Sequence, residues 1–155
     1  AMATFRGADF KIHWHPHMLH NLHIANNFSY LRATDANGNS LPLVPQTRFN
    51  TQLKWQFEID RKFSIENIML QHMSFLEQNQ VAQDESSSPF YQLIHLAANL
   101  HWSTKIPIDI QLGVRNLLNE QYIDHLSRLK NINLDAPGRN FFLSLKFNIN
   151  TKIKS

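Results

Sequence analysis

Apolar and polar side chains alternate along several stretches of this chain. The clearest stretch follows Pro137-Gly138-Arg139 and has apolar residues at every second position: Phe141, Leu143, Leu145, Phe147 and Ile149. Polar residues fill most of the positions between them, and Phe142 is the exception. A period of two puts the two sets on opposite faces of a β-strand, so the stretch predicts a strand with one apolar and one polar face.

The same alternation recurs upstream and predicts about seven long strands. The runs cover residues 6–15, 22–32, 48–59, 64–78, 90–102, 106–115 and 141–149. The fourth run is the least regular, because its apolar residues fall on both parities. The expected fold class is therefore all-β, an antiparallel up-and-down meander of about seven long strands.

The connections between these runs are alternately short and long. Short turns are expected at 16–21, 60–63 and 103–105, and long polar loops at 34–47, 79–89 and 116–136. This is the layout of an up-and-down membrane barrel, with tight periplasmic turns and long extracellular loops. Runs of roughly 10–13 residues also match the ~9–11 that a tilted strand needs to cross a bilayer. We therefore expect a segment of a transmembrane β-barrel.

The aromatic residues agree with a membrane barrel. Those at the short-turn ends, where an interfacial aromatic girdle is expected, are Trp14, Trp55, Phe57, Trp102 and Phe147. The alternative is a soluble antiparallel barrel or sandwich that binds a small apolar ligand inside. The two folds differ in which face of the sheet points outward. Trp55 would point outward in the membrane barrel and inward in the soluble one, and Lys54 would do the reverse.

Composition excludes several other classes. A length of 155 residues suits a single domain, and the net charge of +3 comes without a basic block, so nucleic acid is not an expected partner. The absence of cysteine excludes disulfides and thiolate metal sites. No apolar run approaches the ~20 residues of a transmembrane helix, which excludes a helical membrane protein.

The closing part of the chain resembles TonB-dependent outer-membrane receptors. The matching motifs are Gly113-Val114-Arg115-Asn116-Leu117, then Tyr122, then Pro137-Gly138-Arg139 before the last strand. Upstream, Gly7-Ala8-Asp9-Phe10 and Leu41-Pro42-Leu43-Val44-Pro45 are similar to segments that recur in the family. We interpret Asn116, Leu117, Tyr122, Pro137, Gly138 and Arg139 as a structural motif. Arg139 is expected to anchor its loop through carboxylates or carbonyls, with Asp135 as a candidate partner.

The resemblance implies uptake of a metal ion or a siderophore-like metal chelate across the outer membrane of a Gram-negative bacterium, driven through TonB. Residues 122–128 resemble members associated with zinc or copper uptake. The family barrel has about 22 strands around a plug, so residues 3–150 are expected to be its C-terminal part, 151–155 a polar tail, and the plug absent. Such a piece is expected to be inactive alone, to need no cofactor, and to associate with lipid or with further copies through its open edges.

Two groups of side chains are candidates for chemistry. His13 and His15 share a strand face two residues apart and could approach one metal ion, although polar-face histidines are also ordinary. In the last long loop, His125 with Asp124 and Arg128 is a candidate ligand-binding group, since ligand would arrive from that side.

No enzyme activity is expected. Asp124, His125 and Ser127 have the residue types of a hydrolase triad, but proximity in sequence is not triad geometry. The chain also lacks a G-x-S-x-G nucleophile elbow. His95 and His101 are expected on the polar face.

Overall fold

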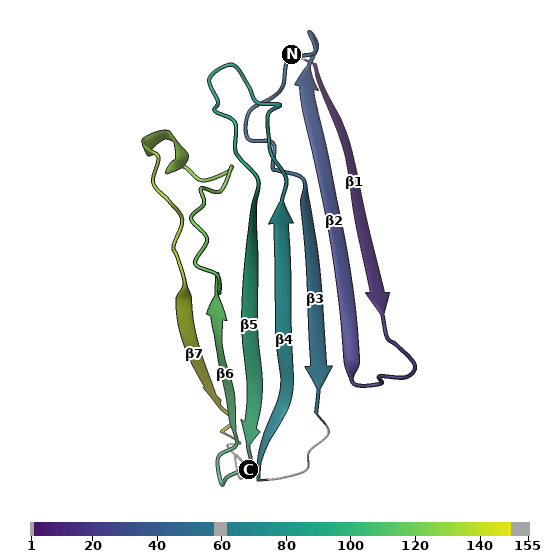
Figure 1. Ribbon diagram of the computed structural model, residues 1–155, viewed down its shortest axis with the longest axis vertical. Helices are drawn as coiled ribbons and strands as arrows, with labels where there is room; N and C mark the ends of the chain where they lie inside the picture. Colours follow the sequence, from purple (N-terminus) through teal and green to yellow (C-terminus); the bar gives the residue numbers. More distant parts are fainter. Residues whose placement is uncertain (1, 58–61, 150–155) are drawn as a thin grey trace, which may run out of the picture.

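The computed structural model describes residues 2–57 and 62–149, which form one seven-stranded antiparallel sheet (Figure 1). The strands are β1 (Ala3–Trp14), β2 (Leu22–Asp35), β3 (Arg48–Gln56), β4 (Phe63–Phe75), β5 (Tyr91–Trp102), β6 (Ile108–Arg115) and β7 (Asn140–Phe147). Each strand pairs with its neighbours in sequence, and the edge strands β1 and β7 make no contact with each other. The predicted fold class is therefore confirmed.

Helix contributes little to the described part of the chain. A single 3-10 turn, η1 (Lys130–Ile132), interrupts the connection between β6 and β7. None of the helical structure among these residues is long and apolar enough to cross a membrane.

Strand boundaries differ from the predicted ones by a few residues. β2 continues to Asp35, whose carboxylate accepts the N–H groups of Asn37 and Asn39 at 2.8 Å each and so turns the chain there. β4 ends at Phe75 rather than at residue 78. The predicted end of the third run, the first half of the turn at 60–63 and the tail at 151–155 lie outside the described residues.

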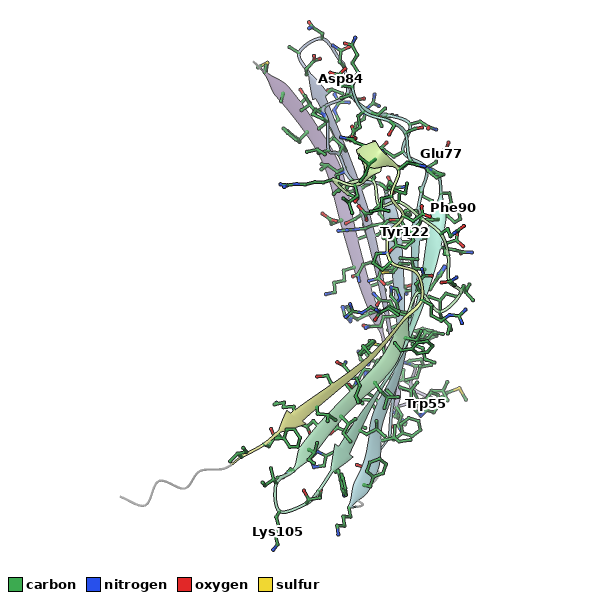
Figure 2. All side chains as sticks on the ribbon, turned by 90° about the vertical axis from the view of Figure 1, so that its left-hand side faces the viewer. Trp55, Glu77, Asp84, Phe90, Lys105 and Tyr122 are labelled. Atoms are coloured by element: carbon green, nitrogen blue, oxygen red, sulfur yellow. The ribbon has the colours of Figure 1, made fainter. Side chains whose placement is uncertain are left out.

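The register of the sheet places most of the apolar residues of all seven strands on one face. Phe28 lies opposite both Phe10 and Phe49, and Leu112 lies opposite Leu143. We call this side the apolar face. Phe10 and Leu143 are each 66% exposed because no second layer covers the sheet, as Figure 2 shows.

The other side, which we call the polar face, is linked by hydrogen bonds between strands. Gln71 donates to Asn50 at 2.9 Å, and Asn99 donates to Asn67 at 2.7 Å. Amide side chains suit this role because each can donate and accept at once. The alternation read from the sequence therefore corresponds to two chemically distinct sheet faces.

A small core nevertheless lies on the polar face, at the end where the long loops are. Phe75 stacks on Tyr91 with ring centroids 4.5 Å apart, and Tyr91 stacks on Tyr122 at 4.6 Å. Leu93 is buried beside them, and Met73 packs against the cluster. This explains the irregular fourth run, because Met73 and Phe75 need an apolar environment on the face that is otherwise polar.

Phe142, the exception to the alternation of the last strand, covers a glycine. A Cβ atom added to Gly113 would lie 2.8 Å from Cζ of the Phe142 ring and 2.4 Å from the Leu96 carbonyl oxygen. The Arg115 guanidinium lies 5.3 Å from the centroid of the same ring. Glycine here allows the ring to lie flat over the neighbouring strand.

Replacing Gly113 with alanine should therefore destabilise the sheet, by about 1–3 kcal/mol, the usual cost of forcing extra volume into a packed site. The measurement is urea unfolding in detergent followed by tryptophan fluorescence. Gly7→Ala is the matched control, since a Cβ there would meet its nearest atom at 3.0 Å instead of 2.4 Å. Equal losses in the two variants would contradict the tighter packing around Gly113.

Candidate functional site

The three long loops meet at one end of the sheet, opposite the short turns (Figure 1). They enclose an open cavity of about 970 Å³, which we call the loop-end cavity. All three loops contribute to its lining, which includes Asn39, Leu43, Asp84, Glu85, Ser86, His125, Arg128 and Lys130. The cavity is thus built from residues far apart in sequence.

His125 is the buried centre of this loop end and is only 3% exposed. Its Nδ1 atom lies 2.8 Å from Ser88 Oγ and 2.9 Å from Lys130 Nζ, and its Nε2 lies 3.3 Å from Glu85 Oε1. An ammonium group can only donate, so Nδ1 carries the lone pair and Nε2 carries the proton. The ring therefore joins residues 85–88 to residues 125–130.

Burial decides the charge of this ring. It lowers the pKa of His125 because a charged imidazole loses its hydration, and the Lys130 ammonium lowers it further. The carboxylates of Glu85 and Asp124 act in the opposite direction without reversing the shift. Burial also lowers the pKa of Lys130. His125 is consequently neutral at neutral pH.

Ser88, His125 and Glu85 have the residue types of a hydrolytic triad but not its chemistry. Ser88 is 1% exposed, so its hydroxyl is closed to a substrate. Lys130 also lies beside the Nδ1 lone pair that would have to accept the serine proton. The arrangement holds the loops together and offers no accessible nucleophile.

The predicted ligand-binding residues have different surroundings in the structure. His125 and Arg128 both line the loop-end cavity, and Arg128 is exposed. Asp124 is outside the lining, and its carboxylate accepts the Tyr91 hydroxyl at 3.3 Å and the Leu126 N–H at 2.8 Å. Glu85 and Lys130 were missed, because loop sequences carry no periodicity that would indicate which residues meet.

Asn116, the central residue of the predicted motif, organises the turn after β6. It has a positive φ of 52° and is 3% exposed. Its side chain accepts the Glu120 N–H at 2.8 Å and donates to the Glu120 carbonyl at 2.9 Å, while its own N–H donates to His95 Nδ1 at 2.9 Å. Leu117 donates its N–H to the Ile94 carbonyl at 2.7 Å, so β5 fixes both residues.

The second half of the motif is tied to the first through Asn119. Its Oδ1 accepts the Arg139 N–H at 2.9 Å, and a Cβ added to Gly138 would lie 2.7 Å from the same atom. The expected pairing of Arg139 with Asp135 is wrong, because no ion pair joins them within the described residues. The contact that anchors Arg139 is its backbone N–H, which Asn119 Oδ1 accepts.

The histidines at the short-turn end pair differently from the expectation. His15 Nδ1 lies 2.6 Å from Nδ1 of His23, and His23 Nε2 lies 2.6 Å from Gln56 Oε1. His13 lies opposite Ala25, and its side chain makes no hydrogen bond within the part of the chain described. Because β1 and β2 form a hairpin, the partner of His15 comes from the returning strand and not from two residues away.

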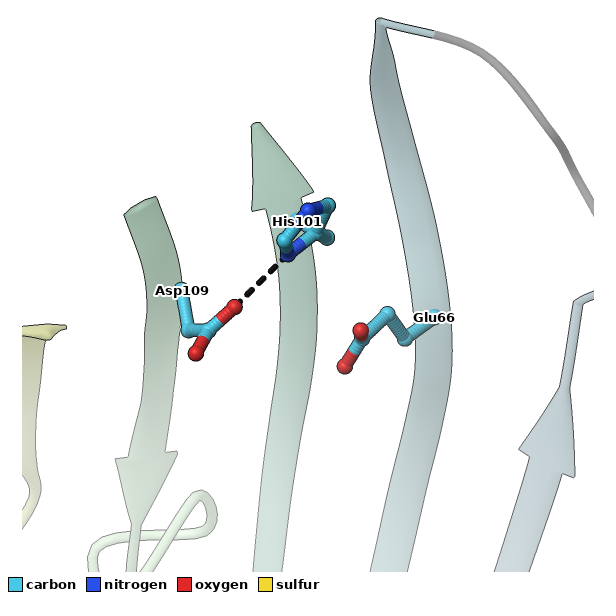
Figure 3. A group of neighbouring side chains, drawn as sticks. All are labelled: Glu66, His101 and Asp109. Carbon is cyan, nitrogen blue, oxygen red and sulfur yellow. Dashed lines mark hydrogen bonds and ion pairs between the residues drawn. The ribbon is translucent and has the colours of Figure 1, made fainter. Parts of the chain in front are cut away.

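A group that the sequence did not reveal lies on the polar face near the short turns. One ligand atom each of Glu66, His101 and Asp109 lies within 4.8 Å of the others (Figure 3). His101 Nδ1 is 2.7 Å from Asp109 Oδ1, and Asn148 donates to the other oxygen of Asp109 at 2.9 Å. One imidazole and two carboxylates are a donor set that a divalent transition metal could use.

A break in the pairing of β4 with β5 explains why the sequence pattern does not predict the position of Glu66. The β4–β5 register shifts between Ile65 and Asn67, which leaves Glu66 without a partner residue in β5. Such a bulge re-aims a side chain and cannot be read from alternation.

Comparisons with known proteins bear on the fold. No protein-family model matches the sequence, and no curated protein matches it. Among solved structures, the chain is similar to the copper transporter OprC, with a TM-score of 0.78 and 17% sequence identity over 95% of this chain. The match covers 24% of that chain, so this chain spans about a quarter of its length. At this identity the likeness establishes a shared β-sheet architecture.

Acidification should loosen the loop end. Opening exposes His125 and restores its ordinary pKa of about 6.5, so the open state binds more protons once the pH falls below that value. The closed loops are therefore fully stable above about pH 6.5 and lose stability as the pH falls through the lowered pKa of His125. Hydrogen exchange at residues 85–88 and 124–130, corrected for intrinsic rates, measures this. His125→Gln should remove the pH dependence, and a dependence that persists in this variant would count against the imidazole.

The Asn119 side chain should be required to hold the two halves of the motif together. It adopts a positive φ of 57°, which glycine tolerates and alanine does not. Both Asn119→Gly and Asn119→Ala should lose hydrogen-exchange protection at the Arg139 amide. Only the alanine variant should show a further loss of stability, of about 1–2 kcal/mol. Retained protection in both variants would show that Asn119 does not hold this turn.

Proposed function

We propose that this chain is the C-terminal part of the barrel of a TonB-dependent outer-membrane receptor that takes up a metal ion or metal chelate. The observation that carries the proposal is the long-stranded meander with all long loops at one end and one predominantly apolar face, on which Asn26 and Thr51 satisfy each other by a hydrogen bond. Similarity to a copper transporter supports the ligand class. Contact with TonB would be made by the plug of the complete receptor, outside residues 1–155.

The apolar face has the dimensions of a membrane band. On β5 its residues run from Ile94 to Trp102, which at about 3.4 Å per residue is roughly 27 Å along the strand. A strand tilt of about 40° reduces this to roughly 21 Å across the membrane, near the ~25 Å band of outer-membrane barrels. Above Ile94 the same face continues with Gln92, which hydrogen-bonds His72 of β4 at 3.1 Å. The band thus ends in polar side chains on the loop side.

The loops are placed for ligand capture. In this orientation the loop-end cavity opens to the outside, and Arg128, Lys130, Asp84 and Glu85 give it charges of both signs. The Glu66–His101–Asp109 group lies on the polar face, which would line the barrel interior. Both features suit a polar cargo better than an apolar one.

The runner-up, a soluble barrel with an apolar interior, fits the contacts less well. In that fold the apolar face would be the inside, and the polar face would meet water. Here the last long loop packs on the polar face, where Tyr122 stacks on Tyr91 and Asn116 bonds to His95. Trp55, on the apolar face, is 38% exposed, and Lys54 is half-buried on the other side.

Tryptophan quenching separates the two functions. All three tryptophans lie on the apolar face near the short turns: Trp14, Trp55 and Trp102. In liposomes, lipids brominated near the headgroup should quench their fluorescence strongly and aqueous acrylamide weakly. Quenching by acrylamide alone, together with a monomer in ultracentrifugation without detergent, would contradict the membrane assignment.

Uptake itself can be tested in the organism that encodes the chain. Deletion of the gene should lower cellular accumulation of one scarce metal under limitation, and complementation should restore it. Copper, zinc and iron are measured in parallel, because the ligand class is a metal ion or its chelate. Unchanged accumulation of all three would reject metal uptake while leaving the membrane assignment intact.

A further inference from the structure

Two arginines lie side by side on the apolar face, at its border with the loops. Arg6 of β1 is directly opposite Arg32 of β2 in the register, and both side chains are exposed. Like charges directly opposite each other in a sheet destabilise it. Neither guanidinium forms an ion pair within the described residues. The chain therefore keeps two uncompensated positive charges at adjacent positions.

The rows of residues below and above this pair change steadily in polarity. Toward the short turns come the pairs Ala8–Tyr30 and Phe10–Phe28, and toward the loops comes Thr4–Thr34. Tyrosine is typical of the membrane–water interface, where its ring is apolar and its hydroxyl is hydrated. With the apolar face in lipid, the arginine row lies just beyond Tyr30, at the level of the lipid headgroups.

The same residues form a shallow groove. Thr4, Arg6, Arg32, Thr34 and Gly38 line a hollow of about 200 Å³. Each guanidinium can bind a phosphate through two parallel N–H donors, and each threonine adds a hydroxyl. Gly38, which has no side chain, leaves the rim open. The donor set suits a phosphate group and offers no carboxylate that would repel it.

We propose that this groove binds the phosphate of a lipid headgroup in the outer leaflet, which in an outer membrane is a phosphorylated glycolipid. The proposal rests on the proposed function, because it needs the apolar face to lie in lipid. The lipid source follows from position, since Arg6 and Arg32 lie on the apolar face, in the row next to Ala8 and Tyr30. Binding the phosphate also relieves the repulsion between the two arginines.

The test titrates the full chain in detergent with diphosphorylated lipid A and with its dephosphorylated counterpart, and counts bound lipid by native mass spectrometry. The unaltered chain should prefer the phosphorylated lipid. The double variant Arg6→Gln/Arg32→Gln should lose this preference, with affinity falling roughly thirtyfold, as two cationic contacts at a charged lipid surface predict. Lys11→Gln is the control for a loss of positive charge elsewhere, because it removes one charge from the opposite face of β1.

Three results would overturn the proposal. One is an unchanged preference in the double variant, and another is an equal loss in the Lys11→Gln control. The third is displacement of the lipid by millimolar inorganic phosphate, which would make the groove a site for free phosphate.

Tryptophan quenching by brominated lipid in the same variants distinguishes failure of the phosphate-binding groove from failure of the membrane assignment. Quenching without phosphate preference rejects the groove alone, whereas loss of quenching in the unaltered chain rejects the membrane assignment.

Discussion

An antiparallel sheet sends alternate side chains to opposite faces, and in this chain the consequence is an apolar face without a covering layer. Apart from the bulge at Glu66, the strands keep their alternation, so residues such as Phe28, Leu53 and Leu112 all lie on one side. Burying such a surface is the main source of favourable free energy in folding. The surroundings must therefore provide what the described chain does not, and under the function proposed above a lipid bilayer would do so.

At the loop end, apolar residues lie on the polar face and are covered by the chain itself. There the face is polar, yet Phe75, Tyr91 and Leu93 are buried because a loop returns over them. Aromatic stacking holds this loop through Tyr122, and the neutral ring of His125 links it to the loop before β5. The long connections are thus ordered by their own packing on the sheet, which gives the cavity between them a defined shape.

Polar chemistry is divided between the two ends of the polar face. The loop-end cavity has charges of both signs, while the imidazole and carboxylates of His101, Asp109 and Glu66 lie near the short turns. A passage through the proposed barrel would need polar groups at both ends, and this sheet would form one wall of it. Its open edges, β1 and β7, are where further strands would continue the wall.

The sequence by itself determined the strands, the two faces and the loop lengths, because a period of two is a local pattern that survives without any tertiary information. It also marked the motif from Asn116 to Arg139, although the role of Asn119 as the tie between its halves was not visible.

Only the tertiary structure decided which loop residues meet. His125 had been a candidate for ligand binding, and the fold buries it against Ser88 and Lys130. Likewise, hairpin geometry paired His15 with His23, and a bulge placed Glu66 beside His101. Contacts of this kind depend on register and on loop packing, which no single stretch of sequence contains.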